Sequence, residues 1–371
     1  MNILVLNAGS STLKYKLLSL RDAADESPRL IAADTFDCAE SVASAAESAI
    51  RKCMPMGINA VGHRVVHGGP KFTAPVRITR NVVHAIQDVS ALAPLHNDNA
   101  LHGIIAGWQL LPNVPAVAVF DTAFHRTIPD VAALYAIPRE LAEKHSLRRY
   151  GFHGISHKYV SMQLLKAMKR DAIGARLITC HLGNGASICA IRDGQSVDTS
   201  MGLTPMEGLV MGTRSGDVDP GLVLHLIRTL NMSPDEVNEL LNHRSGLLGL
   251  SGRSSDVREL EQLARSGDQH ADFALESFAY RVRKYIGAYM AALGGIDAIA
   301  FSGGIGERSP DMRARICRGL ETLRIELDSQ TNASASGKTL QRIDSRRGGI
   351  EVWVVPTDEE TQIARELIGV L

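Results

Sequence analysis

The sequence predicts an α/β protein built from two related domains. Its 371 residues exceed what one hydrophobic core usually organises and suit two domains. Apolar residues make up 45% of the chain and aromatic residues only 5%, so the core must be mainly aliphatic, as in layered α/β folds. A pattern of strand, glycine-containing polar turn and strand occurs twice, at residues 2–20 and 176–192. This distant repetition favours two related domains over a short-period repeat protein.

Apolar and alternating segments define the elements of the first half. Residues 2–6 form a short apolar run, and Leu13, Tyr15 and Leu17 alternate with polar residues, as in a half-buried strand. The strands predicted here are 2–6, 12–20, 60–66 and 115–120, and the helices are 38–53, 81–92, 98–110 and 156–169.

The second half continues in the same style. The predicted strands are 176–181, 187–192, 296–301 and 351–355, and the predicted helices are 219–230, 234–242 and 271–293. Residues 326–349 are polar and rich in Ser, Asn, Gly and Arg, which indicates a surface loop with a short connecting strand.

Composition excludes several classes of partner. Lys plus Arg and Asp plus Glu number 40 each, so no net field attracts nucleic acid or an anionic membrane. The five cysteines form no CxxC pair, and we expect them to be reduced and buried. The first residues contain no basic segment or cleavage site, so we expect no signal peptide, and no apolar run reaches the roughly 18 residues that cross a bilayer. We therefore expect a cytoplasmic protein with neither nucleic acid nor membrane as a partner.

Three glycine-containing turns follow predicted strands, at 7–11, 181–186 and 303–307. Glycine lets backbone N–H groups approach a phosphate closely. The chain has no GxxxxGK[ST] sequence, which excludes a P-loop. Its first strand leads into a hairpin turn instead of GxGxxG and a helix, which argues against a Rossmann dinucleotide site.

Two arginines and two carboxylates are the main candidates for chemistry. Arg64 precedes a Gly-Gly turn and Arg214 lies between glycines, and the guanidinium fork suits carboxylate and phosphate oxygens. Asp121 and Glu359 follow strands, where α/β sheets gather ligands, and Mg²⁺ needs only one or two protein carboxylates. The structural alternatives are surface ion pairs for the arginines and helix caps for the acids.

Histidine and serine patterns narrow the chemistry further. His153 is flanked by glycines in Tyr150–Gly154, and His96 follows Pro94 and Leu95 in a predicted turn. No HExxH sequence or Cys/His ligand spacing indicates zinc, and no GxSxG elbow indicates a serine hydrolase.

Several of these segments resemble the acetate kinase family. Asn7–Lys14 is similar to its NAGSSSxK opening, and Gly62–Gly69 to its GHRVVHGG segment. Thr199–Pro220 resembles the TSMGxTPLEGLxMGTRSGDxDP block. Further similar blocks are 95–97, 120–125, 149–154, 181–187, 302–308 and 356–360. The resemblance covers essentially the whole chain, and blocks this long in this order are highly specific.

The resemblance implies the acetate and sugar kinase/Hsp70/actin fold, in which two duplicated ribonuclease H-like domains bind a nucleotide. We expect the N-terminal domain at 1–150 together with helix 360–371, and the nucleotide-binding domain at 151–359. The implied reaction is reversible in-line phosphoryl transfer between ATP and acetate, which gives acetyl phosphate and ADP. The implied metal is Mg²⁺, with Mn²⁺ as the alternative, and the implied assembly is a homodimer. A propionate kinase of the same family, or a sugar or polyol kinase of the superfamily, remains the alternative reading.

Roles also carry over by position. The resemblance implies that Asn7 and Glu359 bind the metal and that Arg64 and Arg214 hold the carboxylate and the phosphoryl group. It implies that His153 stabilises the transition state. The implied acyl pocket consists of Val66, Leu95 and Pro205 beside the two arginines. The implied nucleotide contacts are Lys14, His181, Leu182, Gly183, Asn184, Gly185, Asp256, Val257, Arg258, Gly304, Ile305, Gly306, Glu307 and Arg308.

Asp121 matches the family's catalytic acidic residue. A substrate carboxylate is already ionised at neutral pH, since such groups have a pKa of about 4–5. It needs no general base, so we expect Asp121 to position the metal, a water or an arginine. Two departures from the family pattern stand out: Asp358 and Arg308 each replace an Asn. Arg308 leaves the base or phosphoryl-donor preference open.

Overall fold

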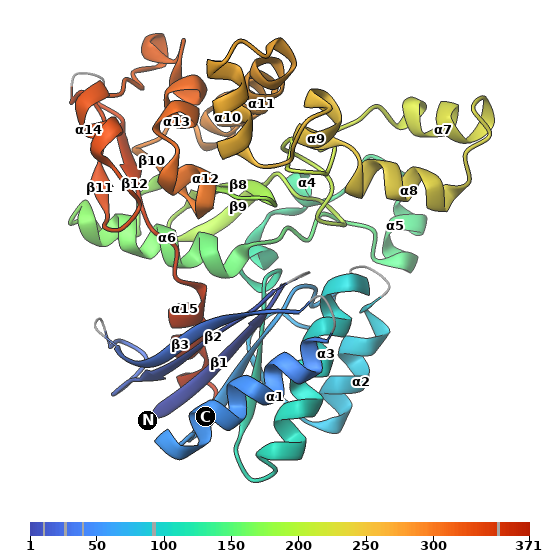
Figure 1. The fold of residues 1–371 in the computed structure, drawn as a ribbon, viewed down its shortest axis with the longest axis vertical. Coiled ribbons are helices and arrows are strands. Elements are labelled where there is room, and N and C mark those ends of the chain that lie inside the picture. Colours follow the sequence, from blue (N-terminus) through green and yellow to red (C-terminus); the bar gives the residue numbers. More distant parts are fainter. Residues whose placement is uncertain (10–11, 26–27, 39–40, 91–93, 347–348) are drawn as a thin grey trace. The chain divides into compact units, whose positions relative to one another are not determined.

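The computed structural model describes all residues except 10–11, 26–27, 39–40, 91–93 and 347–348, and only the backbone of 94–96. The chain forms two compact units (Figure 1). Unit 1 comprises Met1–Arg126, Phe152–Tyr159 and Asp358–Leu371; unit 2 comprises Thr127–Gly151 and Val160–Thr357. The domain boundaries expected at residues 150 and 359 remain a prediction.

Unit 1 contains a six-stranded mixed sheet in the order β3-β2-β1-β4-β6-β5. Strands β1, β2 and β3 are antiparallel, β1, β4 and β6 are parallel, and β5 pairs antiparallel with β6. The strands are β1 (Asn2–Ala8), β2 (Thr12–Ser19), β3 (Arg29–Asp37), β4 (Ala60–Val65), β5 (Val76–Arg77) and β6 (Ala116–Phe120).

Unit 2 repeats this topology. Its sheet has the order β11-β12-β10-β7-β8-β9, with β7, β8 and β9 antiparallel, β7, β10 and β12 parallel, and β11 antiparallel at the edge. The strands are β7 (Arg176–Leu182), β8 (Ala186–Arg192), β9 (Gln195–Thr199), β10 (Ala298–Ser302), β11 (Gln341–Arg342) and β12 (Glu351–Val354). The same order and directions in both sheets confirm an α/β protein with a duplicated fold.

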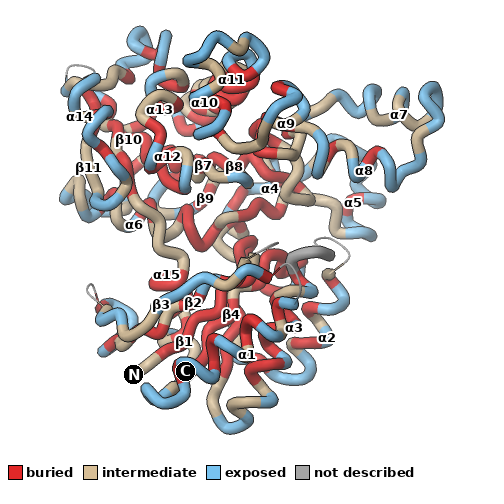
Figure 2. The backbone as a smooth tube through the Cα atoms, viewed as in Figure 1, coloured by how far each residue is buried: buried red, intermediate tan, exposed pale blue. Residues whose placement is uncertain are grey.

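Helices cover both faces of the unit 1 sheet. Successive residues of a strand point to opposite faces, so Leu4 and Leu6 of β1 pack in one core while Ile3 and Val5 pack in another. The first core lies under α1 (Val42–Cys53), α2 (Arg80–Asp88) and α3 (Pro94–Leu110), and the second lies under α15 (Glu359–Ile368). The central strands are accordingly buried along almost their full length (Figure 2).

Unit 2 holds most of the remaining helices, and α6 begins in unit 1 and ends in unit 2. These helices are α4 (Asp130–Ala133), α5 (Arg139–His145), α6 (Gly154–Ala167), α7 (Pro220–Arg228), α8 (Pro234–His243), α9 (Gly246–Ser251), α10 (Val257–Arg265), α11 (Gln269–Leu293), α12 (Gly303–Arg308), α13 (Pro310–Cys317) and α14 (Ser329–Ser334). Among the described helices, none has the length and apolar character needed to cross a bilayer. All five cysteines are free and buried, as predicted.

Two sequence predictions need correction, at residues 303–307 and at His96. Residues 303–307 were expected to form a turn, but the chain forms the short helix α12 there, because Gly303 turns the backbone at φ +75° and the following residues continue helically. His96 was expected in a turn, but the backbone there belongs to α3. Strands β3, β5 and β9 were not predicted; the side chains of β3, the longest of them, are mostly exposed and lack an apolar alternation. Four predictions fall partly outside the described residues: the turn at 7–11, the helices at 38–53 and 81–92, and the loop at 326–349.

His63 makes unit 1 sensitive to acid. Its side chain is buried in β4, its Nε2 has no hydrogen-bond partner among the described residues, and burial lowers the pKa of His63 to about 3. In the unfolded chain His63 is protonated below about pH 6.5, whereas in the folded chain it stays neutral down to about pH 3. The free energy of unfolding therefore falls as the pH drops from 6.5 towards 3.

We predict that His63→Phe removes part of this acid sensitivity. The aromatic ring keeps the approximate shape but cannot be protonated. Between pH 7 and pH 5, urea unfolding of the natural protein should lose about 2 kcal/mol more than unfolding of the variant. An equal loss in both proteins would contradict the assignment.

Candidate active site

The centre of the unit 1 site is an ion pair between Arg64 and Asp121. Arg64 lies near the carboxyl end of β4 and Asp121 directly follows β6, the neighbouring parallel strand. Arg64 Nε and Nη2 donate to the two Asp121 carboxylate oxygens at 3.1 and 2.6 Å, and Asp121 is fully buried. A bidentate pair of this kind is strong and fixes the direction of the guanidinium.

Burial and charge act against each other in this pair. Burial lowers the pKa of Arg64, but the charges of Asp121 and Glu359 raise it by more, so the guanidinium stays protonated. Burial raises the pKa of Asp121, and the charge and hydrogen bonds of Arg64 oppose that rise. Arg64 therefore presents a permanent positive charge at the end of the sheet.

Asp121 also holds the loop that carries His153. The backbone N–H of His153 donates to the Asp121 carboxylate, and the Gly154 N–H donates to the Asp121 carbonyl oxygen at 3.0 Å. His153 adopts a left-handed backbone with φ 56°, and a Cβ on Gly154 would lie 2.0 Å from the Asp121 carbonyl oxygen. Only glycine fits there. Because the Asp121 oxygens are engaged in this way, the carboxylate acts as an anchor.

Asn7 connects Arg64 to the start of α15. Its Oδ1 accepts from Arg64 Nη1 at 3.1 Å, and its Nδ2 donates to Glu359 and Glu360 at 2.9 and 2.7 Å. Asp358 caps α15 by accepting from the Thr361 N–H, and this role suits Asp as well as the Asn of the family pattern. The helix cap thus places Glu359 beside Asn7.

The oxygen donors at this point fit a hard divalent cation. Within the described residues, no group of three or more His, Cys, Asp or Glu side chains could hold a metal. Mg²⁺ does not require one, because it commonly takes one or two protein oxygens and completes its shell with water and phosphate. Asn7 Oδ1 and the Glu359 carboxylate are the residues that would hold it.

The other predicted residues of unit 1 lie in different surroundings. Val66 is buried just after β4, and Lys14 is exposed on β2 opposite Asn7 in the strand register. Leu95 belongs to α3, but its side chain lies outside the described part of the chain.

In unit 2, Arg214 is a second candidate anion ligand. Its Nη1 donates to the Pro205 carbonyl oxygen at 3.0 Å, and burial lowers its pKa. Throughout the described residues it makes no ion pair, so its charge is uncompensated. The loop before it is tied to the β7–β8 hairpin, because the Gly212 N–H donates to the Asn184 carbonyl oxygen at 3.0 Å. Arg214 is thereby held close to the hairpin.

A cavity of about 430 Å³ in unit 2 collects most of the predicted nucleotide ligands. The hairpin contributes Gly183 and Asn184, and Gly304 leaves open space where a side chain would stand. The full lining is Gly183, Asn184, Ser255, Asp256, Val257, Arg258, Glu261, Gly304, Ile305, Arg308 and Ser309.

The lining of this cavity differs in both directions from the nucleotide contacts expected from the sequence. Sequence reasoning missed Ser255, Glu261 and Ser309, which no motif marked. The residues of unit 2 that it named as nucleotide contacts but that do not line the cavity are His181, Leu182, Gly185, Gly306 and Glu307. Glu307 has a structural task, since its carboxylate accepts the N–H groups of Gly303 and Thr357, each at 2.9 Å.

Three features together define a class of protein. They are two sheets of the same topology, a guanidinium held by a carboxylate beside oxygen donors that suit a metal, and a cavity whose lining includes Gly183 and Gly304. They are the features of a phosphotransferase with duplicated ribonuclease H-like domains.

Comparison with known proteins identifies the family. A profile described as "Acetokinase family" matches residues 29–365. An acetate kinase of Dictyoglomus thermophilum is 45% identical over 398 aligned positions, covering 100% of this chain and 99% of that protein. The solved acetate kinase of Porphyromonas gingivalis is 40% identical with a TM-score of 0.88, covering 100% and 99% of the two chains. The chain belongs to the acetokinase family and is a phosphotransferase that acts on a carboxyl group.

A solved propionate kinase of Francisella tularensis is similar to the same extent. It is 40% identical to this chain, with a TM-score of 0.89 and full coverage of both chains. Family membership is therefore clear, whereas the length of the acyl substrate is a separate question.

We predict that Arg64→Gln and Asp121→Asn each lower kcat by about 10²–10³-fold. The first variant removes the positive charge that would stabilise the transferred group, and the second weakens the contact that orients the Arg64 guanidinium. Initial rates with acetate and MgATP give kcat, and thermal melting checks that each variant folds.

The pH profile distinguishes an anchor from a general base. The Asp121→Asn variant should keep the shape of the natural profile at a lower level. Loss of an acidic limb in that variant alone would show that Asp121 accepts a proton in the reaction.

Proposed function

We propose that this protein is an acetate kinase, which transfers a phosphoryl group directly and reversibly between ATP and acetate to give acetyl phosphate and ADP. The observation that carries the proposal is Arg64, a buried and permanently charged guanidinium fixed by Asp121. Such a group suits an anionic acceptor, because a guanidinium forms stronger, charge-assisted hydrogen bonds with a carboxylate than with the neutral hydroxyl of a sugar. The similarity to proteins named acetate kinase over their full lengths supports the same choice.

The chemistry requires positioning and charge stabilisation more than proton transfer. Acetate is ionised at neutral pH and attacks the terminal phosphorus as it is, so no residue has to remove a proton. Arg64, Arg214 and His153 stabilise the charge that spreads over the transferred phosphoryl oxygens. Asp121 is a positioning residue, because it acts by orienting Arg64 and the His153 backbone.

Mg²⁺ belongs to the proposal, with Mn²⁺ as the alternative. When bound, it would neutralise charge on the nucleotide phosphates. Asn7 and Glu359 would hold it, and Lys14 would contact the nucleotide from β2.

The choice of acyl chain length is proposed from the family resemblance, which assigns the methyl group of the substrate to an apolar pocket of Val66, Leu95 and Pro205. One methylene changes binding by only about 1–3 kcal/mol in such a pocket, so propionate is the second candidate substrate. The similar Francisella protein named propionate kinase is the observation that favours it.

We predict that acetate is the better substrate. Formation of the acyl hydroxamate with MgATP should give a kcat/KM for acetate about 10-fold or more above that for propionate, because the extra methylene must be accommodated. Omission of Mg²⁺ serves as the control and should abolish turnover. A higher value for propionate would make the protein a propionate kinase, and absence of turnover with both acids would refute the proposal.

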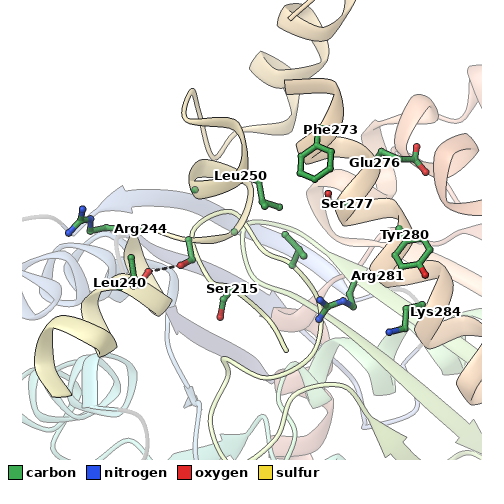
Figure 3. A pocket seen from close by; sticks show the side chains of 14 residues that line it. Ser215, Leu240, Arg244, Leu250, Phe273, Glu276, Ser277, Tyr280, Arg281 and Lys284 are labelled. Atoms are coloured by element: carbon green, nitrogen blue, oxygen red, sulfur yellow. Dashed lines mark hydrogen bonds between the residues drawn. The ribbon is translucent and has the colours of Figure 1, made fainter. Parts of the chain in front are cut away.

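The proposed assembly is a cytoplasmic homodimer, and α11 offers the surface for it. Phe273 and Tyr280 are 59% and 56% exposed on this helix. They line a cavity of about 820 Å³, with Leu240 and Leu250 on its other side (Figure 3). Large exposed aromatic groups beside such a hollow are typical of protein interfaces.

The side chains along α11 suit an antiparallel copy of the same helix. Phe273, Ser277, Tyr280, Lys284 and Gly287 follow the 4-3-4-3 spacing of a helix–helix seam. About a two-fold axis at Tyr280, Glu276 would face the partner's Lys284, and Phe273 would face the partner's Gly287. Gly287 has open space beside it. We therefore propose a second copy of this chain as the occupant.

We predict that Tyr280→Glu converts the dimer to a monomer, because it places like charges on the two-fold axis. Light scattering with size exclusion measures the mass. Ile173→Glu is the matched control, since Ile173 is 87% exposed between α6 and β7 and should leave the dimer intact. A monomeric natural protein, or a dimeric Tyr280→Glu variant, would contradict this surface.

A further inference from the structure

Arg308 is an uncompensated cation in the unit 2 cavity. It is the last residue of α12, it is exposed, and within the described residues its guanidinium makes no hydrogen bond or ion pair. Arg258 lines the same cavity but is already bound to Asp256, with Nε at 3.1 Å from one carboxylate oxygen. Of these two arginines, Arg308 is the one with all its donors available to a ligand.

Glu261 supplies a fixed carboxylate to the same cavity. It lies on α10, accepts a hydrogen bond from the Ser309 hydroxyl, and is 3.4 Å from Arg265 Nη2. A carboxylate has about four acceptor positions, so these contacts leave Glu261 able to accept further hydrogen bonds. Because Ser309 directly follows Arg308, this contact joins α10 to the end of α12, and both Glu261 and Arg308 line the same cavity.

The position of this pair in the cavity indicates the base end of a nucleotide. Gly183 and Asn184 mark the phosphate end, since Asn184 is hydrogen-bonded to the loop that carries Arg214. Glu261 also lines a neighbouring cavity of about 710 Å³ with Arg265 and Pro310, so it lies at an edge of the nucleotide cavity. No residue of the hairpin lines that second cavity.

The two side chains match the hydrogen-bonding pattern of a 6-oxopurine. Guanine presents the O6 and N7 acceptors, which suit the arginine fork, and its N1–H and exocyclic amine are donors that suit a carboxylate. Adenine places a donor at position 6 and an acceptor at N1, so it opposes donor to donor at Arg308 and acceptor to acceptor at Glu261.

We propose that Arg308 and Glu261 form a base-recognition pair that gives this enzyme a preference for guanine nucleotides over adenine nucleotides. The inference rests on the proposed function, in which this cavity binds the phosphoryl donor. ATP remains a substrate, because the phosphate end of the cavity is the same for both nucleotides. Arg308 and Glu261 are specificity-determining residues and take no part in the transfer itself.

The test compares GDP, IDP and ADP by titration calorimetry on the natural protein and on Arg308→Asn, Glu261→Gln and Arg228→Asn. The natural protein should bind GDP and IDP about 10-fold more tightly than ADP. Arg308→Asn should weaken GDP and IDP by about 10-fold and leave ADP within about 2-fold. Glu261→Gln should weaken GDP in the same way. Arg228 on α7 is exposed and outside the cavity, so Arg228→Asn should change nothing.

Other outcomes overturn the inference and separate its failure from that of the proposed function. Equal weakening of all three nucleotides by Arg308→Asn would show that Arg308 binds phosphate. Equal affinities for GDP and ADP in the natural protein, with turnover of acetate, would refute the base preference and leave the kinase intact. Binding of none of the three nucleotides, without turnover, would refute both.

Discussion

The buried ion pair of Arg64 and Asp121 is the interaction on which the unit 1 site depends. It joins the ends of two neighbouring parallel strands, and each partner then fixes another segment. Asp121 holds the loop at His153, while Arg64 reaches Asn7 and through it the start of α15. Breaking such a pair by removing one partner commonly costs about 3–5 kcal/mol, so the arrangement has little freedom to vary.

The duplicated sheets show how one fold supplies two kinds of site. Asn7 in β1 and His181 in β7 occupy equivalent positions of the two sheets. The neighbouring parallel strands, β4 and β10, place Arg64 and Ser302 at corresponding positions beside them. Unit 1 carries a cation there. Unit 2 instead has a small residue followed by Gly303, whose backbone lies so close to Leu182 that a Cβ would be 2.6 Å from its carbonyl oxygen. The first arrangement suits anion chemistry, and the second leaves room for a nucleotide.

Much of the fold and the site could be predicted because the information was local. Apolar runs predicted the central strands, and the roles implied by the family resemblance included Arg64, Asp121 and most of the cavity lining. Strand β3 escaped because its exposed side chains carry no periodic signal. Glu261 and Ser309 escaped because their hydrogen bond joins residues 48 positions apart. The sequence left open whether Asp121 positions the metal, a water or an arginine, and its bidentate contact with Arg64 favours the arginine.

The most direct test of the Arg64–Asp121 pair is a double-mutant cycle in kcat with Arg64→Gln, Asp121→Asn and the combined variant. If Asp121 supports the reaction by orienting Arg64, the double variant should lose about as much kcat as Arg64→Gln alone, because Asp121 then has no effect once Arg64 is absent. If the two losses multiply, Asp121 acts independently of Arg64, as it would through the His153 backbone, and the claim that it works by orienting Arg64 is wrong.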